Sequence, residues 1–153
     1  AGQRAALGAA ILFTMPGEPM LYHGQEWGEG TPRITNERNA LHWEATGQPQ
    51  GKELLARHQL LAQLRRDHPA LRSDTFSLDA SYPDQKAVVY HRWNNEGDEV
   101  LVAANFSPQL QTVVIPFPHD GRWTDQLTGR SLKVQGHPTL DLAADTAAIY
   151  VAG

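Results

Sequence analysis

The apolar residues of this 153-residue chain change their spacing near residue 73, and this change limits the folds that the chain can adopt. Before it, the segments 3–14 and 51–67 are rich in strong helix formers. After it, short runs of β-branched and aromatic residues alternate with turn residues. We therefore expect an α+β chain with two domains, helical over residues 1–72 and antiparallel β over residues 73–153.

The segment 51–67, GKELLARHQLLAQLRRD, carries the clearest helical pattern. Leu54 and Leu61 fall two turns apart on one face, and glutamines fall on the opposite face. A His-Pro pair follows and predicts the end of the helix, because the residue before a proline disfavours the helical conformation. Arg65 and Arg66 near this end are expected to be solvated, with their stems lying along apolar surface.

The second half reads as a series of strands separated by turns such as NNEGD and SPQLQ. Strands at this spacing are typical of an antiparallel sandwich. The expected strands lie at 86–93, 99–106 and 111–117, with weaker ones at 122–126, 131–134, 139–142 and 147–152.

The first half does not contain enough partners to bury itself. The segment 3–14 is apolar or small at almost every position after Arg4, so we expect it to be buried on all sides. The short apolar run 19–24 reads as a buried strand ending at Gly24, and a lone strand leaves both of its edges open. Its neighbours are therefore expected in a longer parent chain or another subunit, and self-association through this unpaired segment is a further possibility.

Charge and composition exclude several classes of function. The net charge is −4 without any basic block, so no nucleic-acid partner is expected. No apolar run is long enough to span a bilayer, so no membrane partner is expected. The chain has no cysteine and no His-Glu-x-x-His motif, and we expect neither a metal nor another cofactor. The compartment stays open.

One short stretch brings in a resemblance to a known family. The sequence GEPMLYHGQE resembles the segment around the eighth barrel strand of the alpha-amylase superfamily of glycoside hydrolases. The matching positions are Gly17, Pro19, Tyr22, Gly24 and Glu26.

Later segments resemble the same family in the same order. RNALHWE, with Arg38 and Trp43, resembles the loop that follows the eighth strand, and LLARHQLLAQLRRDHPALRS resembles the last barrel helix. VLVAANFS at 100–107 and RWTDQLTG at 122–129 resemble parts of the C-terminal sandwich. The resemblance implies a terminal helix–strand–helix piece of a (β/α)8 barrel followed by an antiparallel β-sandwich.

The resemblance also implies a reaction whose central residues are missing here. Family members are similar to the retaining scheme, with a carboxylate nucleophile and a carboxylic acid/base. In the family these two residues, and a third Asp in an Asn-His-Asp motif, precede the segment matched here. This chain contains no Asn-His-Asp, so no catalytic residue is assigned. We expect the C-terminal portion of an α-glucan-active hydrolase or transglycosylase, inactive by itself. The alternative is a non-catalytic carbohydrate-binding or structural domain.

The resemblance places the loop 24–44 at the rim of the substrate cleft, since barrel enzymes build their sites at the carboxyl ends of the strands. His23, Glu26, Trp27 and Trp43 are the candidate substrate-binding residues. The two tryptophans could stack on sugar rings or anchor the loop, and His23 could face substrate or be structural.

Two further sets of residues leave alternatives open. Glu18, Glu26 and Glu29 could form an acid/base set. Alternatively, Glu26 makes structural hydrogen bonds and the other two are solvated. Trp93 and Trp123 could form a sugar-binding surface, or could simply pack in the core or at an edge of the sandwich.

Overall fold

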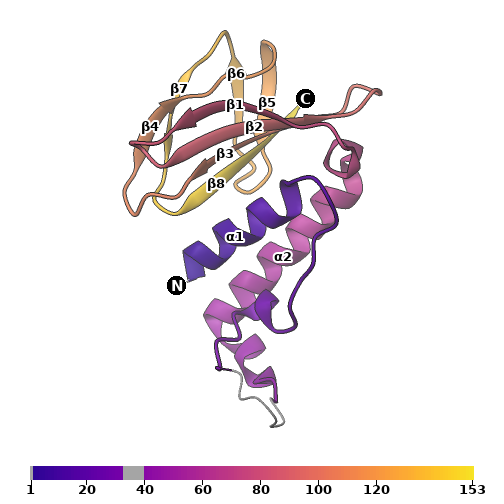
Figure 1. Ribbon diagram of the computed structural model, residues 1–153, viewed down its shortest axis with the longest axis vertical. Coiled ribbons are helices and arrows are strands. Elements are labelled where there is room, and N and C mark those ends of the chain that lie inside the picture. Colours follow the sequence, from indigo (N-terminus) through magenta and orange to yellow (C-terminus); the bar gives the residue numbers. More distant parts are fainter. Residues whose placement is uncertain (1, 33–39) are drawn as a thin grey trace.

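The computed structural model describes residues 2–32 and 40–153, and in it a pair of helices lies under a β-sandwich (Figure 1). The helices are α1 (Gly2–Thr14) and α2 (Pro49–Asp67), with three short 3₁₀ turns, η1 (Gln25–Trp27), η2 (Trp43–Gly47) and η3 (Pro69–Arg72). The strands are β1 (Ser77–Tyr82), β2 (Ala87–Trp93), β3 (Glu99–Asn105), β4 (Gln111–Val114), β5 (Gly121–Asp125), β6 (Ser131–Val134), β7 (Thr139–Leu142) and β8 (Thr146–Ala152).

The strands form two antiparallel sheets, which confirms the expected β-sandwich. The larger sheet has the order β1-β2-β3-β8-β5-β6, and β4 pairs with β7 in the smaller one. Every strand expected in the second half of the sequence is present, although β4 stops at Val114, two residues before Pro116. Leu101, Ile115 and Trp123 are fully buried between the sheets, so Trp123 is a core residue.

The other face of the large sheet packs on the helices. Successive residues of β2 serve different cores, because side chains alternate along a strand: Val89 lies between the sheets and Tyr90 faces the helices. On the helix side, Phe13 of α1 and Leu61 of α2 join Tyr90 and Val102 in one apolar cluster. The helix pair and the sandwich therefore share a core.

Two buried arginines connect these layers at the C-terminal end of α1. Arg92 of β2 is fully buried and donates hydrogen bonds to the main-chain carbonyls of Thr14 (2.6 Å), Thr75 (2.5 Å) and Ser73. Arg65 of α2 donates to the carbonyl of Phe13 (2.9 Å) and to that of Gly17. Removal from water lowers the pKa of both guanidinium groups. The last carbonyls of a helix lack partners within the helix and carry partial negative charge, which both cations offset.

This arrangement corrects one expectation from the sequence. Arg65 was expected on a solvated face, but its side chain is turned into the layer between α1 and α2, where carbonyls need donors. Its neighbour Arg66 is 71 % exposed and confirms the expectation for that position.

The described structure bears on two expectations for the first half, and one of them is wrong. Helix α1 is exposed at Gln3, Arg4, Ala5 and Gly8, which agrees with the expectation that this chain's own partners cannot cover the whole helix. The run 19–24 forms no strand: Met20 is 79 % exposed, and the residues around it carry no regular structure. A strand needs a neighbouring strand to satisfy its main-chain hydrogen bonds, and the described part of this chain offers none there.

Replacing Arg92 tests the connection between the layers. We expect Arg92→Met to lower the free energy of unfolding by roughly 3 kcal/mol, because three main-chain carbonyls lose their donor in or near the core. The exposed Arg122 of β5 gives a matched control, and Arg122→Met should change stability by less than about 0.5 kcal/mol. Urea unfolding followed by circular dichroism measures both. Equal losses in the two variants would contradict a special role for Arg92.

Candidate functional site

The candidate site begins after Gly17, the last residue beyond α1 whose carbonyl accepts a hydrogen bond from Arg65. Beyond Gly17, whose carbonyl Arg65 holds, residues 18–22 run without regular structure along the surface. Tyr22 at the end of this run is 51 % exposed, and its ring stacks on that of His23 with centroids 5.1 Å apart. His23 is exposed as well, and it lines a cavity of about 420 Å³ together with Gln25, Glu29 and Leu41.

Two glycines shape the turn that follows. Gly24 and Gly28 flank η1 with φ of 88° and 81°, in the left-handed region that suits glycine. The Gly24 carbonyl accepts the main-chain N–H of Glu29 at 2.8 Å and closes the turn. A Cβ atom on Gly24 would lie 2.5 Å from the Cβ of Glu29, so this position has both a conformational and a steric reason to be glycine.

The two tryptophans of the loop form one pair. Trp27 is only 6 % exposed and Trp43 is 63 % exposed. Their ring centroids lie 4.8 Å apart with 38° between the ring planes. Trp27 therefore supports Trp43 from beneath, and the exposed ring of Trp43 is available to a planar or ring-shaped ligand.

Glu26 lies within η1, between the turn glycines. The residue is half-buried, and its Oε2 atom is buried without a hydrogen-bond partner in the described structure. The indole N–H of Trp27 is in the same condition. A buried polar atom without a partner is costly, so both atoms indicate that the surroundings of η1 are not satisfied by the described residues alone.

A carboxylate clip that the sequence did not reveal closes the loop. The main-chain N–H groups of Thr31 and His42 donate to Glu29 at 3.0 and 2.9 Å, and Nδ1 of His42 lies 3.2 Å from Oε2 of Glu29. Hydrogen bonds from the Thr31 side chain and from the main chain of His42 lower the pKa of Glu29 to about 2. Glu29 is thus a charged structural acceptor at neutral pH, which argues against its use as a proton donor.

The four candidate residues are brought together in part. His23, Glu26 and Trp27 lie around η1, and Trp43 joins them through its contact with Trp27, although 16 positions separate these tryptophans. Arg38 lies outside the described residues. No group of three or more His, Asp or Glu side chains suited to a metal ion occurs within residues 2–32 and 40–153. In the same part of the chain, no helix is long and apolar enough to cross a membrane.

Comparisons with known proteins place this chain in a family. Residues 78–152 match the family model of the alpha amylase C-terminal all-beta domain. Over 157 residues the chain is 32 % identical to alpha-amylase MalA of Haloarcula japonica, which covers 99 % of this chain and 22 % of that protein. It is 31 % identical over 132 residues to the 1,4-alpha-glucan branching enzyme GlgB of Rhodopseudomonas palustris, covering 80 % of this chain and 18 % of the enzyme.

A solved structure has the same fold along nearly the whole chain. An alpha-amylase from Anoxybacillus superposes with a TM-score of 0.82 at 24 % identity, over 99 % of this chain and 32 % of that one. The chain belongs to the alpha-amylase superfamily of glycoside hydrolases, and residues 78–152 are its C-terminal all-beta domain. It spans about a fifth of the length of the curated relatives it matches.

The Glu29 clip predicts a transition in acid. A carboxyl group whose pKa falls from about 4.5 to about 2 on folding stabilises the folded loop above pH 4.5, and this stabilisation is lost as the pH drops towards 2. We expect the fluorescence of Trp43, next to His42, to change over this range. Glu29→Gln should remove the change, because the amide does not titrate there. The exposed Glu96 gives the control: Glu96→Gln should keep it, and identical titrations of the two variants would contradict the clip.

Proposed function

We propose that this chain is the C-terminal portion of a glycoside hydrolase or transglycosylase that acts on α-glucans, and that the catalytic carboxylates lie outside it. The observation that carries the proposal is the alignment of 99 % of the chain, helices and sandwich together, with 22 % of an alpha-amylase. A branching enzyme and a cyclomaltodextrinase are also among the relatives. We therefore propose only the class of reaction, hydrolysis or glycosyl transfer on an α-glucan, and not one particular reaction.

The helix pair supports the finer proposal that residues 1–72 belong to a (β/α)8 barrel. Helices α1 and α2 pack side by side, as the outer helices of a barrel do, and residues 18–22 between them form no strand (Figure 1). Met20, Leu21 and Tyr22 in this run are 79 %, 39 % and 51 % exposed, so apolar side chains lie open where barrel strands would cover them. Self-association through the same surface is the alternative, which sedimentation velocity would detect as a dimer or larger species.

Within the parent enzyme, the loop 24–44 is proposed to contact substrate. Trp43 offers an exposed ring for stacking on a sugar, and Trp27 holds that ring in place. His23, which lines the adjoining cavity, is placed to hydrogen-bond sugar hydroxyls. Glu26 is proposed as the neighbouring substrate-binding residue, although its unpartnered Oε2 atom is buried. The same features suit a non-catalytic carbohydrate-binding domain, which is the second candidate function.

Activity measurements separate these two functions. We expect this chain alone to release no reducing sugar from starch or maltodextrin, because the mechanism needs a nucleophile and an acid/base that the family resemblance places outside it. The natural gene product that carries this segment should show α-glucan turnover. Turnover by the isolated chain that Glu26→Gln abolishes would overturn the proposal. A gene product that binds glucan without turnover would favour the binding domain.

Trp43→Ala tests the contact of the loop with substrate. In the natural gene product we expect about a fivefold lower kcat/KM for maltodextrin, with most of the change in KM, since stacking on a bound sugar ring is worth on the order of 1 kcal/mol. Phe106 is also exposed, at 45 %, but lies on the sandwich, so Phe106→Ala is the control and should leave the kinetics unchanged. Equal kinetic effects would remove Trp43 from the site.

A further inference from the structure

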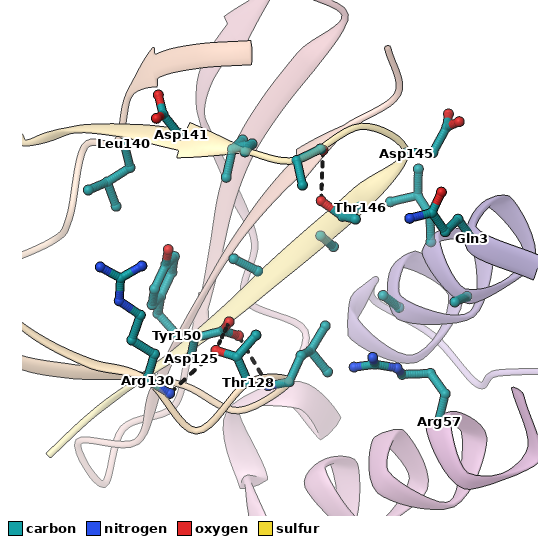
Figure 2. A pocket seen from close by; sticks show the side chains of 18 of the residues that line it. Gln3, Arg57, Asp125, Thr128, Arg130, Leu140, Asp141, Asp145, Thr146 and Tyr150 are labelled. Atoms are coloured by element: carbon teal, nitrogen blue, oxygen red, sulfur yellow. Dashed lines mark hydrogen bonds between the residues drawn. The ribbon is translucent and has the colours of Figure 1, made fainter. Parts of the chain in front are cut away.

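A large open cavity, here called the inter-layer groove, lies between the helices and the sandwich and has no role in the function proposed above. Its volume is about 790 Å³, within the range of roughly 300–1,000 Å³ that is typical of ligand-binding clefts. Gln3 of α1 and Arg57 of α2 lie on one wall, and Arg130, Asp141 and Tyr150 lie on the sandwich wall (Figure 2).

Several polar groups of the groove lack partners. Nη1 of Arg57 is buried and has no hydrogen bond in the described structure. The guanidinium of Arg130, an exposed residue, and the hydroxyl of Tyr150 form no hydrogen bond or ion pair among residues 2–32 and 40–153, although neither belongs to the buried atoms without a partner. Burial, and then the nearby Asp125, raise the pKa of Tyr150 to about 12, so its hydroxyl keeps its proton at neutral pH. The groove thus offers donors on both walls that a ligand could satisfy.

Two carboxylates of the groove differ in how many hydrogen bonds they accept. Asp125 is saturated: its Oδ1 accepts the main-chain N–H groups of Leu127 and Ile149, both at 3.1 Å, and its Oδ2 accepts the hydroxyl of Thr128 at 2.6 Å. These bonds hold the β5–β6 hairpin in place (Figure 2). Asp141 accepts one bond, from Thr112, and is exposed, so it remains able to accept another.

The charge of the lining restricts the class of ligand. Two arginines and four carboxylates, those of Glu53, Asp125, Asp141 and Asp145, line the groove. An excess of carboxylates disfavours phosphates and other anions. A metal ion is also disfavoured, because no suitable ligand group occurs among the described residues. A neutral ligand that both donates and accepts hydrogen bonds fits this lining.

The rest of the lining is apolar. Six leucines contribute to it from both helices, from the turn between β5 and β6, and from strands β6 and β7, namely Leu7, Leu54, Leu127, Leu132, Leu140 and Leu142. A glucose ring presents apolar C–H faces and a rim of hydroxyl groups, so an oligosaccharide can place its faces on the leucines and its rim against the unpartnered polar groups.

We propose that the inter-layer groove binds a short α-glucan, at a place separate from the loop of residues 24–44. This proposal rests on the proposed function for its choice of the α-linked sugar. The groove itself is a feature of this chain, with walls from both of its layers.

Titration of the ¹⁵N-labelled chain with maltotetraose tests the proposal. We expect saturable shifts of amide signals from residues 125–132 and 139–150. Tyr150→Phe keeps the ring and removes only the hydroxyl, and should weaken binding about fivefold. Arg57→Met should weaken it by a similar factor without loss of stability, because Nη1 of Arg57 has no hydrogen bond to lose in the folded chain. Arg122→Met, an exposed change outside the groove, should leave affinity unchanged.

The other outcomes are distinct. No saturable shift in the folded chain would overturn the groove as a sugar site, even if the parent enzyme acts on α-glucans. Shifts confined to residues 22–43 would overturn it as well and move binding to the loop. Cellotetraose, which is β-linked, is the matched ligand control. If it binds in place of maltotetraose, the α-glucan assignment fails for the groove and the proposed function loses support.

Discussion

Two arginines that donate hydrogen bonds to main-chain carbonyls hold the C-terminal end of α1, and the position of the candidate site depends on them. Arg92 reaches this end from the sandwich and Arg65 reaches it from α2, each through main-chain carbonyls. A guanidinium group has five N–H donors in a fixed plane, so one side chain can satisfy several carbonyls at once. Lysine could not reproduce this geometry, because its donors radiate from a single atom.

Through Arg92, the sandwich helps to position the loop of residues 24–44. Thr14 accepts from Arg92 through its carbonyl, and its hydroxyl lies 2.6 Å from that of Tyr90 in β2. Gly17, three residues on, is held by Arg65. The segment leading to Trp27 thus starts from a point fixed by the sandwich and α2 together. One apolar cluster also joins the two halves of the chain. Residues 1–72 and 73–153, which the sequence predicts as two domains, both contribute side chains to it and pack against each other.

Much of the fold could be read from local patterns. The strands β2, β3 and β8 are rich in β-branched residues, and α2 has leucines at helical spacing, so local preference and burial agree. Strand β1 was missed because SLDASY contains no β-branched residue and lies at the sheet edge, half-exposed on both faces. At 19–24 the sequence predicts a strand that the described structure does not contain. The apolar residues there favour a strand, but a strand also needs a neighbouring strand, and the described residues provide none.

The sequence by itself determined the family, the order of helices and strands, and the tryptophans of the loop, because these follow from motifs and from side-chain periods along the chain. Only the tertiary structure decided which tryptophan is exposed, that Glu29 is a clip joined to His42, and that Arg65 is buried. It also decided that an open groove separates the helices from part of the sandwich. Each of these depends on contacts between residues far apart in the chain, and no local pattern of residues encodes the distance between them.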